Sequence, residues 1–507
     1  MPHTCAPTDT MATAPAALAL FGDDAAAVLT RFLHNVRDNQ ALSYTLPAYN
    51  GSISDTLPHV QLQQSAGRWP SMNGSWPGDN GGFAPAFPMT VLRLWRALGD
   101  VELVKRHWYA LETFMNTTEA MCGRVPAPMA FKNADGTFGP SGTKCGWYGD
   151  WSRPTHRFAS TSEAGQFVSA FWLLKQRDAM QELATAIGRM DVAAAFSAAA
   201  ADGREHFDAY FWNASLSTWA GGPAADADFI QTYSALGLAL GCDGGKALGS
   251  LERRNRALAA LVHDLAQRGG NHNVGLMGWT QLLPVLSHFM QPLMAQRVAS
   301  STDFPSIGYM LRHYGVGSTL WERWQPLDTT LPASVYNNTS YDHPMFGSVA
   351  AWLLHGLAGL DASHLGSTGI LRVRPGVGIK LTSSEDSANI TTLHSDLDNV
   401  ITGASAAQNT TAGHAAVTWQ LVPGPKASSL SLSLNVTVPL GCLAELLLPV
   451  SADYVHITEA EGTLWQHGQF VSGVTGVLGA TAREGGVLVT IASGAYTIFA
   501  AQAAAAQ

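Results

Sequence analysis

The chain has 507 residues, of which 46% are hydrophobic and only 13% are charged, and its net charge is −9 at pH 7. This length is enough for more than one domain and for a large buried core. The acidic balance weighs against nucleic acid or an anionic membrane surface as a partner. No apolar run approaches the ~20 residues of a membrane span. The charge balance fits a neutral substrate. The 15 Trp residues are a high count, for which stacking on sugars and packing in the core are both explanations.

Hydrophobic side chains recur at helical spacing from about residue 12 to residue 360. In residues 24–36, for example, Val28, Phe32 and Val36 lie on one helical face. The same spacing predicts further helices over residues 88–98, 162–174, 184–211, 229–240, 251–265, 276–289, 292–300 and 347–360. Long loops rich in Gly, Pro, Asn and Trp join some of them, and such loops are usually functional. Paired helices with elaborate loops predict a helical toroid.

After residue 360 the hydrophobic pattern changes to a period of two. Residues 430–438 alternate Leu or Val with polar side chains, which is typical of a half-buried strand. Further strands are predicted over residues 446–450 and 487–491. The sequence therefore predicts a helical domain over residues 1–360 and a small β-sandwich over residues 361–507.

The cysteines and the glycosylation sequons bear on the cellular compartment. None of the five Cys forms a C-x-x-C pair, so no metal site is predicted. Cys122 and Cys145 flank one loop, and a disulfide between them stays open. Residues 1–22 make a poor signal peptide. The Asn-X-Ser/Thr sequons nevertheless favour a secreted or vacuolar glycoprotein; they lie at Asn50, Asn73, Asn116, Asn213, Asn337, Asn338, Asn389, Asn409 and Asn435.

One segment, G-S-T-L-W-E-R-W, places the carboxylate of Glu322 between Trp321 and Trp324. A carboxylate can activate water for attack on a sugar while indole faces, including that of Trp324, cover the ring. The structural alternative is a salt bridge from Glu322 to Arg323 or Arg153. The segment favours a glycosidase, although glycoside hydrolysis normally needs two carboxyl groups.

Two other segments carry candidate substrate contacts. In Y-D-H-P-M-F-G-S, His343 either binds a sugar hydroxyl or caps a helix that starts near Gly347, and Asp342 has the same ambiguity. In G-W-Y-G-D-W, Asp150 and Trp151 belong to an aromatic loop. That loop either forms a ligand platform or folds its rings onto its own domain.

A third segment, S-W-P-G-D-N-G-G, offers Trp76 and Asp79, and its structural alternative is a turn in which Asp79 caps a helix. Motifs for other chemistries are absent from the sequence. It contains no G-x-S-x-G elbow, no G-x-x-x-x-G-K-[ST] phosphate loop and no H-E-x-x-H zinc motif. No cofactor is therefore predicted.

Taken in order, these segments resemble the α-L-rhamnosidases of glycoside hydrolase family 78. The resemblance runs from residue 32 to the end of the chain. It rests on F-L-H-N-V-R-D-N-Q at 32–40, G-W-Y-G-D-W at 146–151, F-P-S-I-G-Y-M at 304–310, G-S-T-L-W-E-R-W at 317–324, Y-D-H-P-M-F-G-S at 341–348 and R-V-R-P-G at 372–376. It implies an (α/α)6 six-hairpin barrel followed by a small β-sandwich.

The resemblance also implies a reaction, the inverting hydrolysis of a terminal α-L-rhamnoside. Glu322 matches the general base, and His343 matches a histidine that contacts rhamnose. Trp151 matches a tryptophan that packs on the substrate, with Asp150 as its loop partner. A tryptophan–aspartate pair of the family is matched only loosely, by Trp76 and Asp79, because Pro77 and Gly78 separate them.

One family motif, D-x-x-x-x-E-R-x-G-W-x-G-D, has no counterpart before the helix over residues 23–37, and the first glutamate is Glu102. That motif supplies the general acid. Either the sequence is a piece of a longer protein, which we favour, or it is a shortened homologue. Asp79 and Asp150 are the candidate replacement acids.

These observations predict a rhamnosidase-type glycoside hydrolase with feeble or no activity on aryl rhamnosides. Loss of general-acid help removes about 10²–10⁴ in rate. One alternative is a non-catalytic carbohydrate-binding homologue. Another is a different inverting hydrolase or a phosphorylase on the same barrel, for which Arg323 is the only local basic residue.

Overall fold

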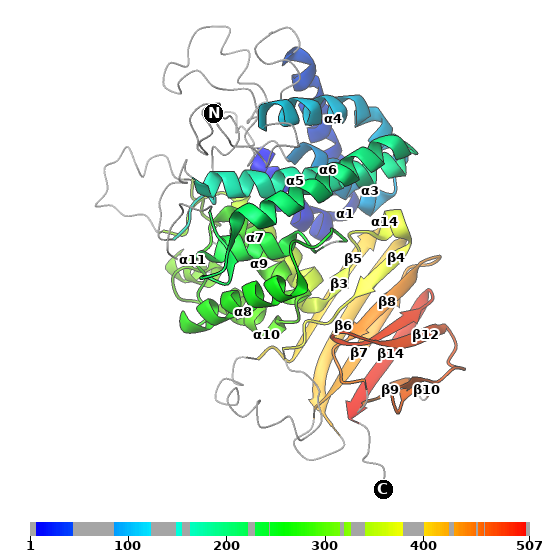
Figure 1. Cartoon of the computed structure of the whole chain (residues 1–507). Helices are drawn as coiled ribbons and strands as arrows, with labels where there is room; N and C mark the ends of the chain where they lie inside the picture. The colour runs from blue at the N-terminus through cyan, green and yellow to red at the C-terminus, as the bar shows by residue number, and fades with distance from the viewer. Residues whose placement is uncertain are drawn as a thin grey trace.

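A computed structural model describes most of the chain, and helices occupy its first part and strands its last part (Figure 1). The described residues are 7–43, 86–122, 149–154, 163–221, 229–242, 244–314, 319–325, 340–378, 400–424, 430–452, 455–460 and 462–502. None of the helices in these ranges is long and apolar enough to cross a membrane.

The helical part is a ring of packed helices. Its longer members are α1 (Pro7–Ser43), α3 (Ala86–Leu98), α4 (Val101–Cys122), α5 (Glu163–Ala186), α6 (Met190–Phe211), α7 (Gln231–Ala239), α8 (Leu251–Gln267), α9 (Leu276–His288), α10 (Pro292–Ser300) and α11 (Ile307–Tyr314). The last turns are the 3-10 helix η2 (Pro344–Ser348), α13 (Val349–Trp352) and the π-helix η3 (Leu353–Ala358). The first helix, α1, packs against α3 and also against η2 and α13, so the first and last helical elements meet.

The predicted helices are largely confirmed. The helix expected over residues 251–265 is α8, and the one expected over residues 292–300 is α10. The helix expected over residues 184–211 is instead divided between α5 and α6, because Gly188 takes a φ of 79° at the break. The helices α4 and α11 were not predicted.

The helical part holds a two-stranded sheet of β1 (Trp212–Asn213) and β2 (Thr218–Trp219), and the described strands from residue 360 onward form two sheets, one of seven strands and one of five. The larger sheet contains β5 (Gly403–Thr410), β6 (Gly413–Pro423), β7 (Leu430–Val438), β9 (Val455–Glu459), β10 (Gly462–Gln466), β11 (Gln469–Phe470) and β14 (Gly494–Gln502). The smaller sheet contains β3 (Leu360–Asp361), β4 (Ile370–Val373), β8 (Leu443–Leu448), β12 (Val477–Arg483) and β13 (Gly486–Ile491), with the short α14 (Leu365–Thr368) before β4. The strand predicted over residues 430–438 is β7.

All strand pairs are antiparallel except β4 with β8, which run parallel. The inward-facing side chains of the sheets form their own hydrophobic cluster, which includes Trp419, Leu446 and Ile498. The helices bury a separate cluster that extends to Trp352. The predicted fold class, helices followed by a β-sandwich, is confirmed, while the limits 1–360 and 361–507 stay a prediction.

Candidate active site

A loop over residues 149–154 covers the first turn of α9. The Asp150 carboxylate accepts hydrogen bonds from the backbone N–H of Gly275 (2.6 Å) and of Gly278 (2.9 Å), and from the Thr232 hydroxyl. These amides belong to the start of the helix, where backbone N–H groups have no partner within the helix. Burial raises the pKa of the Asp150 carboxyl, and its hydrogen bonds from Thr232, Gly278 and Gly275 oppose that shift. With both oxygens engaged, Asp150 is suited to positioning the loop.

The next residue, Trp151, is held through its backbone and its ring. Its carbonyl accepts a hydrogen bond from the Leu276 N–H at 2.8 Å. A Cβ at Gly275 would stand 2.1 Å from that carbonyl oxygen, so only glycine allows this approach. On the other side, the Arg323 guanidinium lies 5.8 Å from the centre of the half-buried Trp151 ring, within cation–π range.

The segments 319–325 and 340–343 run beside each other and position Glu322. The Glu322 N–H donates to the Ser340 carbonyl (2.9 Å), and the Ser340 N–H donates to Glu322 Oε2 (3.0 Å). The His343 N–H donates to the carbonyl of Leu320 at 2.9 Å. The half-buried carboxylate is thus oriented by a backbone amide that contacts one of its two oxygens.

His343 caps the 3-10 helix η2, which begins at Pro344. Its Nδ1 accepts a hydrogen bond from the Met345 N–H at 3.3 Å. The capping role considered from the sequence is therefore present, although the helix starts before Gly347. Because Nδ1 is the acceptor, the neutral ring carries its proton on Nε2. That N–H is a donor suited to a sugar hydroxyl, so capping and substrate contact are compatible.

The two indoles beside Glu322 lie in the core, which corrects the expectation that Trp324 covers a sugar. Trp321 and Trp324 are 1% and 0% exposed. The Trp324 Nε1–H donates to the Val274 carbonyl (2.9 Å), and its ring stacks on Phe346 with centroids 3.9 Å apart. His272 lies against the same indole at 4.4 Å. Both rings are therefore packed in the hydrophobic core, where they anchor the segment that carries Glu322.

The loop with Trp151 and the segment with Glu322 are joined directly. The Gln325 side-chain amide donates to the carbonyls of Pro154 (2.8 Å) and Arg153 (3.3 Å). The segment before α9 joins them through the Trp324–Val274 hydrogen bond. Glu322, His343, Trp151 and Asp150 therefore belong to one set of interlocked segments at the start of α9, whereas Trp76, Asp79 and the Cys122–Cys145 pairing lie outside the described residues.

The contributors that were not predicted include Ser340, Thr232, Gly275 and Gly278. No local pattern marks them, because they act through backbone amides or a hydroxyl on distant segments. The described residues contain no group of three or more His, Cys, Asp or Glu side chains that could hold a metal ion.

A ring of packed helices followed by mainly antiparallel sheets is the architecture found in six-hairpin glycosidases. The family model of the bacterial alpha-L-rhamnosidase 6 hairpin glycosidase domain matches residues 8–357. The chain belongs to this family.

The similar proteins include alpha-L-rhamnosidases of two organisms. Over 141 residues, the chain is 28% identical to an alpha-L-rhamnosidase of Streptomyces avermitilis; the alignment covers 28% of this chain and 13% of that protein. The fold is similar to that of the alpha-L-rhamnosidase from Dictyoglumus thermophilum, with a TM-score of 0.72 and 19% identity over 98% of this chain and 46% of that one.

A further similar structure is that of the Streptomyces avermitilis alpha-L-rhamnosidase complexed with L-rhamnose. Its TM-score is 0.68, with 20% identity over 98% of this chain and 38% of that one. The chain thus spans less than half of the length of each of these two solved proteins.

Proposed function

We propose that this chain binds a terminal α-L-rhamnosyl group and that Glu322 is the general base of an inverting hydrolysis. The observation that carries the proposal is the reciprocal backbone pairing of Glu322 with Ser340, which orients the carboxylate next to the His343 segment. Family membership and the similar alpha-L-rhamnosidase complexed with L-rhamnose support the choice of sugar.

In this proposal, Glu322 takes a proton from a water molecule that attacks the anomeric carbon. The bond to the leaving group breaks, and the sugar inverts its configuration. The Nε2–H of His343 donates to a rhamnose hydroxyl, and the Trp151 ring covers an apolar part of the sugar. The leaving oxygen takes its proton from an acid that in inverting enzymes lies roughly 6.5–9.5 Å from the base.

Asp150 is a poor replacement for that acid. Both of its oxygens accept hydrogen bonds at the start of α9, so a proton held there would break part of the cap. We therefore infer that Asp150 does not donate this proton. Asp79, the other candidate acid, lies outside the described residues, and weak proton donation to the leaving group stays a prediction from the sequence. When proton donation is weak, the hydrolysis rate falls least for substrates whose leaving groups need little protonation.

The test compares the hydrolysis rates of the parent chain and of Glu322→Gln on three rhamnosides. We expect slow hydrolysis of 2,4-dinitrophenyl α-L-rhamnoside, and feeble or no hydrolysis of the 4-nitrophenyl and methyl rhamnosides because general-acid help worth about 10²–10⁴ is missing. Glu322→Gln should lower the rate on the activated substrate by at least about 10²-fold. Calorimetry should show that L-rhamnose binding changes only a few-fold. Initial rates and the anomer first formed, by NMR, are the measurements.

The matched control is Glu484→Gln, the same change at an exposed turn of the sheets. Unchanged turnover in Glu322→Gln would refute the general-base role. Robust hydrolysis of the methyl rhamnoside would refute the prediction that proton donation to the leaving group is weak. If rhamnose binds and even the activated substrate is not hydrolysed, the chain is a carbohydrate-binding homologue. The occupied carboxylate of Asp150 is the observation that favours this second function.

A further inference from the structure

A cavity of about 520 Å³ lies where the helical part meets the sheets, away from the candidate active site. Its walls come from α1, α3, α9, η3 and the first strands of the smaller sheet, and its lining does not include Glu322, His343 or Trp151. The volume is within the range of small-molecule sites. The cavity contains the arginines of the R-V-R-P-G segment, which the proposed function leaves unexplained.

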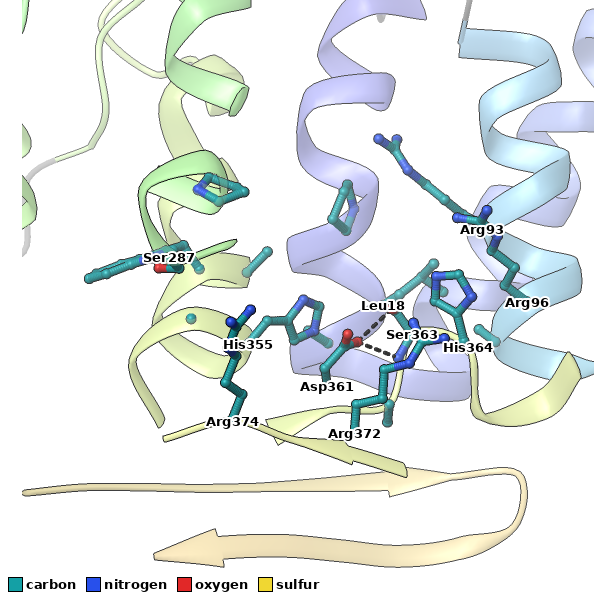
Figure 2. A pocket seen from close by; sticks show the side chains of 18 of the residues that line it. Leu18, Arg93, Arg96, Ser287, His355, Asp361, Ser363, His364, Arg372 and Arg374 are labelled. Carbon is teal, nitrogen blue, oxygen red and sulfur yellow. Dashed lines mark hydrogen bonds between the residues drawn. The ribbon is translucent and has the colours of Figure 1, made fainter. Parts of the chain in front are cut away.

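Strand geometry directs these two arginines to the cavity. Successive residues of a strand point to opposite faces. Val373 is 1% exposed and faces the core of the sheets, so Arg372 and Arg374 share the other face. Figure 2 shows both side chains rising from the strand toward His355 and Ser363, and both line the cavity.

The backbone of this segment is fixed against the last helical turn. The Arg374 N–H donates to the Gly359 carbonyl (2.8 Å), and the Gly376 N–H donates to the Leu357 carbonyl (3.0 Å). A Cβ at Gly376 would stand 2.3 Å from the Gly356 carbonyl oxygen. Because the two backbones touch, the positions of both arginines are set by the junction between the helices and the sheets.

Arg374 carries a positive charge that its surroundings compensate poorly. Burial lowers the pKa of its guanidinium. Its Nη2 donates to the thioether sulfur of Met290 at 2.7 Å, which is a weak acceptor. By contrast, Arg96 in the same cavity is paired with both oxygens of Glu182. Arg374 is half-buried, where a guanidinium without an oxyanion is costly, and its planar fork of N–H groups matches carboxylate and phosphate oxygens.

Two carboxylates line the cavity, Asp23 and Asp361. Asp23 belongs to α1 and is exposed, and Asp361 is already occupied. Its Oδ1 accepts from the backbone N–H (3.0 Å) and the hydroxyl (2.5 Å) of Ser363. Burial acts to raise the pKa of Asp361, but the positive charge of His355, the Ser363 hydrogen bonds and the charge of His364 outweigh burial and lower it. Asp361 is therefore compensated by its own neighbours. The arginine face remains cationic in a protein of net charge −9.

We propose that this cavity binds a small oxyanion, either a phosphate group or the carboxylates of a small organic acid, with Arg374 and Arg372 as its principal ligands. Bound there, the anion contacts β4 and the last helical turn together. It therefore links the helices to the sheets and stabilises the folded chain by RT ln(1 + L/Kd), where L is the free anion concentration. This binding is independent of the rhamnoside site.

The experiment measures thermal unfolding and calorimetric binding with inorganic phosphate and with citrate, each at constant ionic strength set with sodium chloride. With at least one of the two anions we expect a saturable calorimetric isotherm and an unfolding temperature that rises with the logarithm of the anion concentration above its Kd. Phosphate alone identifies a phosphate site, citrate alone a carboxylate site, and both a general oxyanion site. The absence of any saturable effect beyond that of chloride overturns the proposal.

Arg374→Met tests the assignment, because methionine keeps part of the apolar stem without the charge. It should weaken anion binding at least tenfold, while without anion the variant should unfold no earlier than the parent chain. Should that variant fail to fold, Arg372→Gln serves instead, with an expected loss of several-fold. Arg483→Gln, at an exposed position of β12, is the matched control. Unchanged anion affinity in Arg374→Met overturns the proposal, and so does unchanged affinity in Arg372→Gln if that variant has to replace it. This result does not depend on the outcome of the rhamnoside assays.

Discussion

Replacing Asp150 with alanine is expected to lower the free energy of unfolding by about 3 kcal/mol and to release Trp151 from its position. The substitution leaves the N–H groups of Gly275 and Gly278 and the hydroxyl of Thr232 without their acceptor in a buried place. Each such group costs about 1–3 kcal/mol. Part of that sum is offset because the buried carboxylate, whose pKa burial raises, no longer has to be desolvated.

Urea unfolding at neutral pH measures the loss, and L-rhamnose calorimetry measures the effect on the site. Asp150→Asn keeps one acceptor oxygen. Its loss of stability should therefore be about half of that in Asp150→Ala, on the order of 1–2 kcal/mol. The control is Asp24→Ala, at an exposed aspartate of α1. A loss below about 1 kcal/mol in Asp150→Ala, or unchanged rhamnose affinity despite a large loss, would show that the cap does not position Trp151.

Regular elements could be predicted because their hydrophobic period is local. The strand β7 and the helix α8 follow directly from alternation and from helical spacing. The helix α4 carries the same signal in Val104, Trp108 and Leu111, all buried, so its omission was an avoidable error. The break between α5 and α6 was harder to predict, because the alanines on both sides favour a continuous helix.

The candidate site could be predicted only in part, for a physical reason. Glu322 and His343 stand out by residue type in their segments. Outside a helix or strand, however, no period indicates which side chains are buried, so the sequence could not show that Trp324 is a core residue. The cap on α9 joins residues 125 positions apart in the chain. Its amide donors belong to the backbone and leave no trace in residue type.

The stability of the helical part is expected to fall as the pH drops from about 6.5 to about 3, because of His272. This histidine is buried beneath the site, 4.4 Å from the Trp324 ring and 4.9 Å from that of Trp279. Burial lowers its pKa to about 3. In the unfolded chain the imidazole takes up a proton below about pH 6.5, whereas in the folded chain it stays neutral until about pH 3. The unfolded state therefore binds more protons in this window, and acid favours unfolding.

The expected slope is about 1.4 kcal/mol per pH unit, so lowering the pH from 7 to 4.5 removes on the order of 2–3 kcal/mol through this one group. His272→Asn isolates the effect, because asparagine keeps an acceptor for the Val274 N–H and does not titrate. The variant should be less stable than the parent at pH 7, where it loses ring packing, but its stability should fall less between pH 7 and pH 4.5. His263→Asn, at an exposed histidine of α8, is the control. Urea unfolding of all three proteins at both pH values decides the matter: equal losses in the parent and His272→Asn would mean that the buried imidazole is not the group that senses acid.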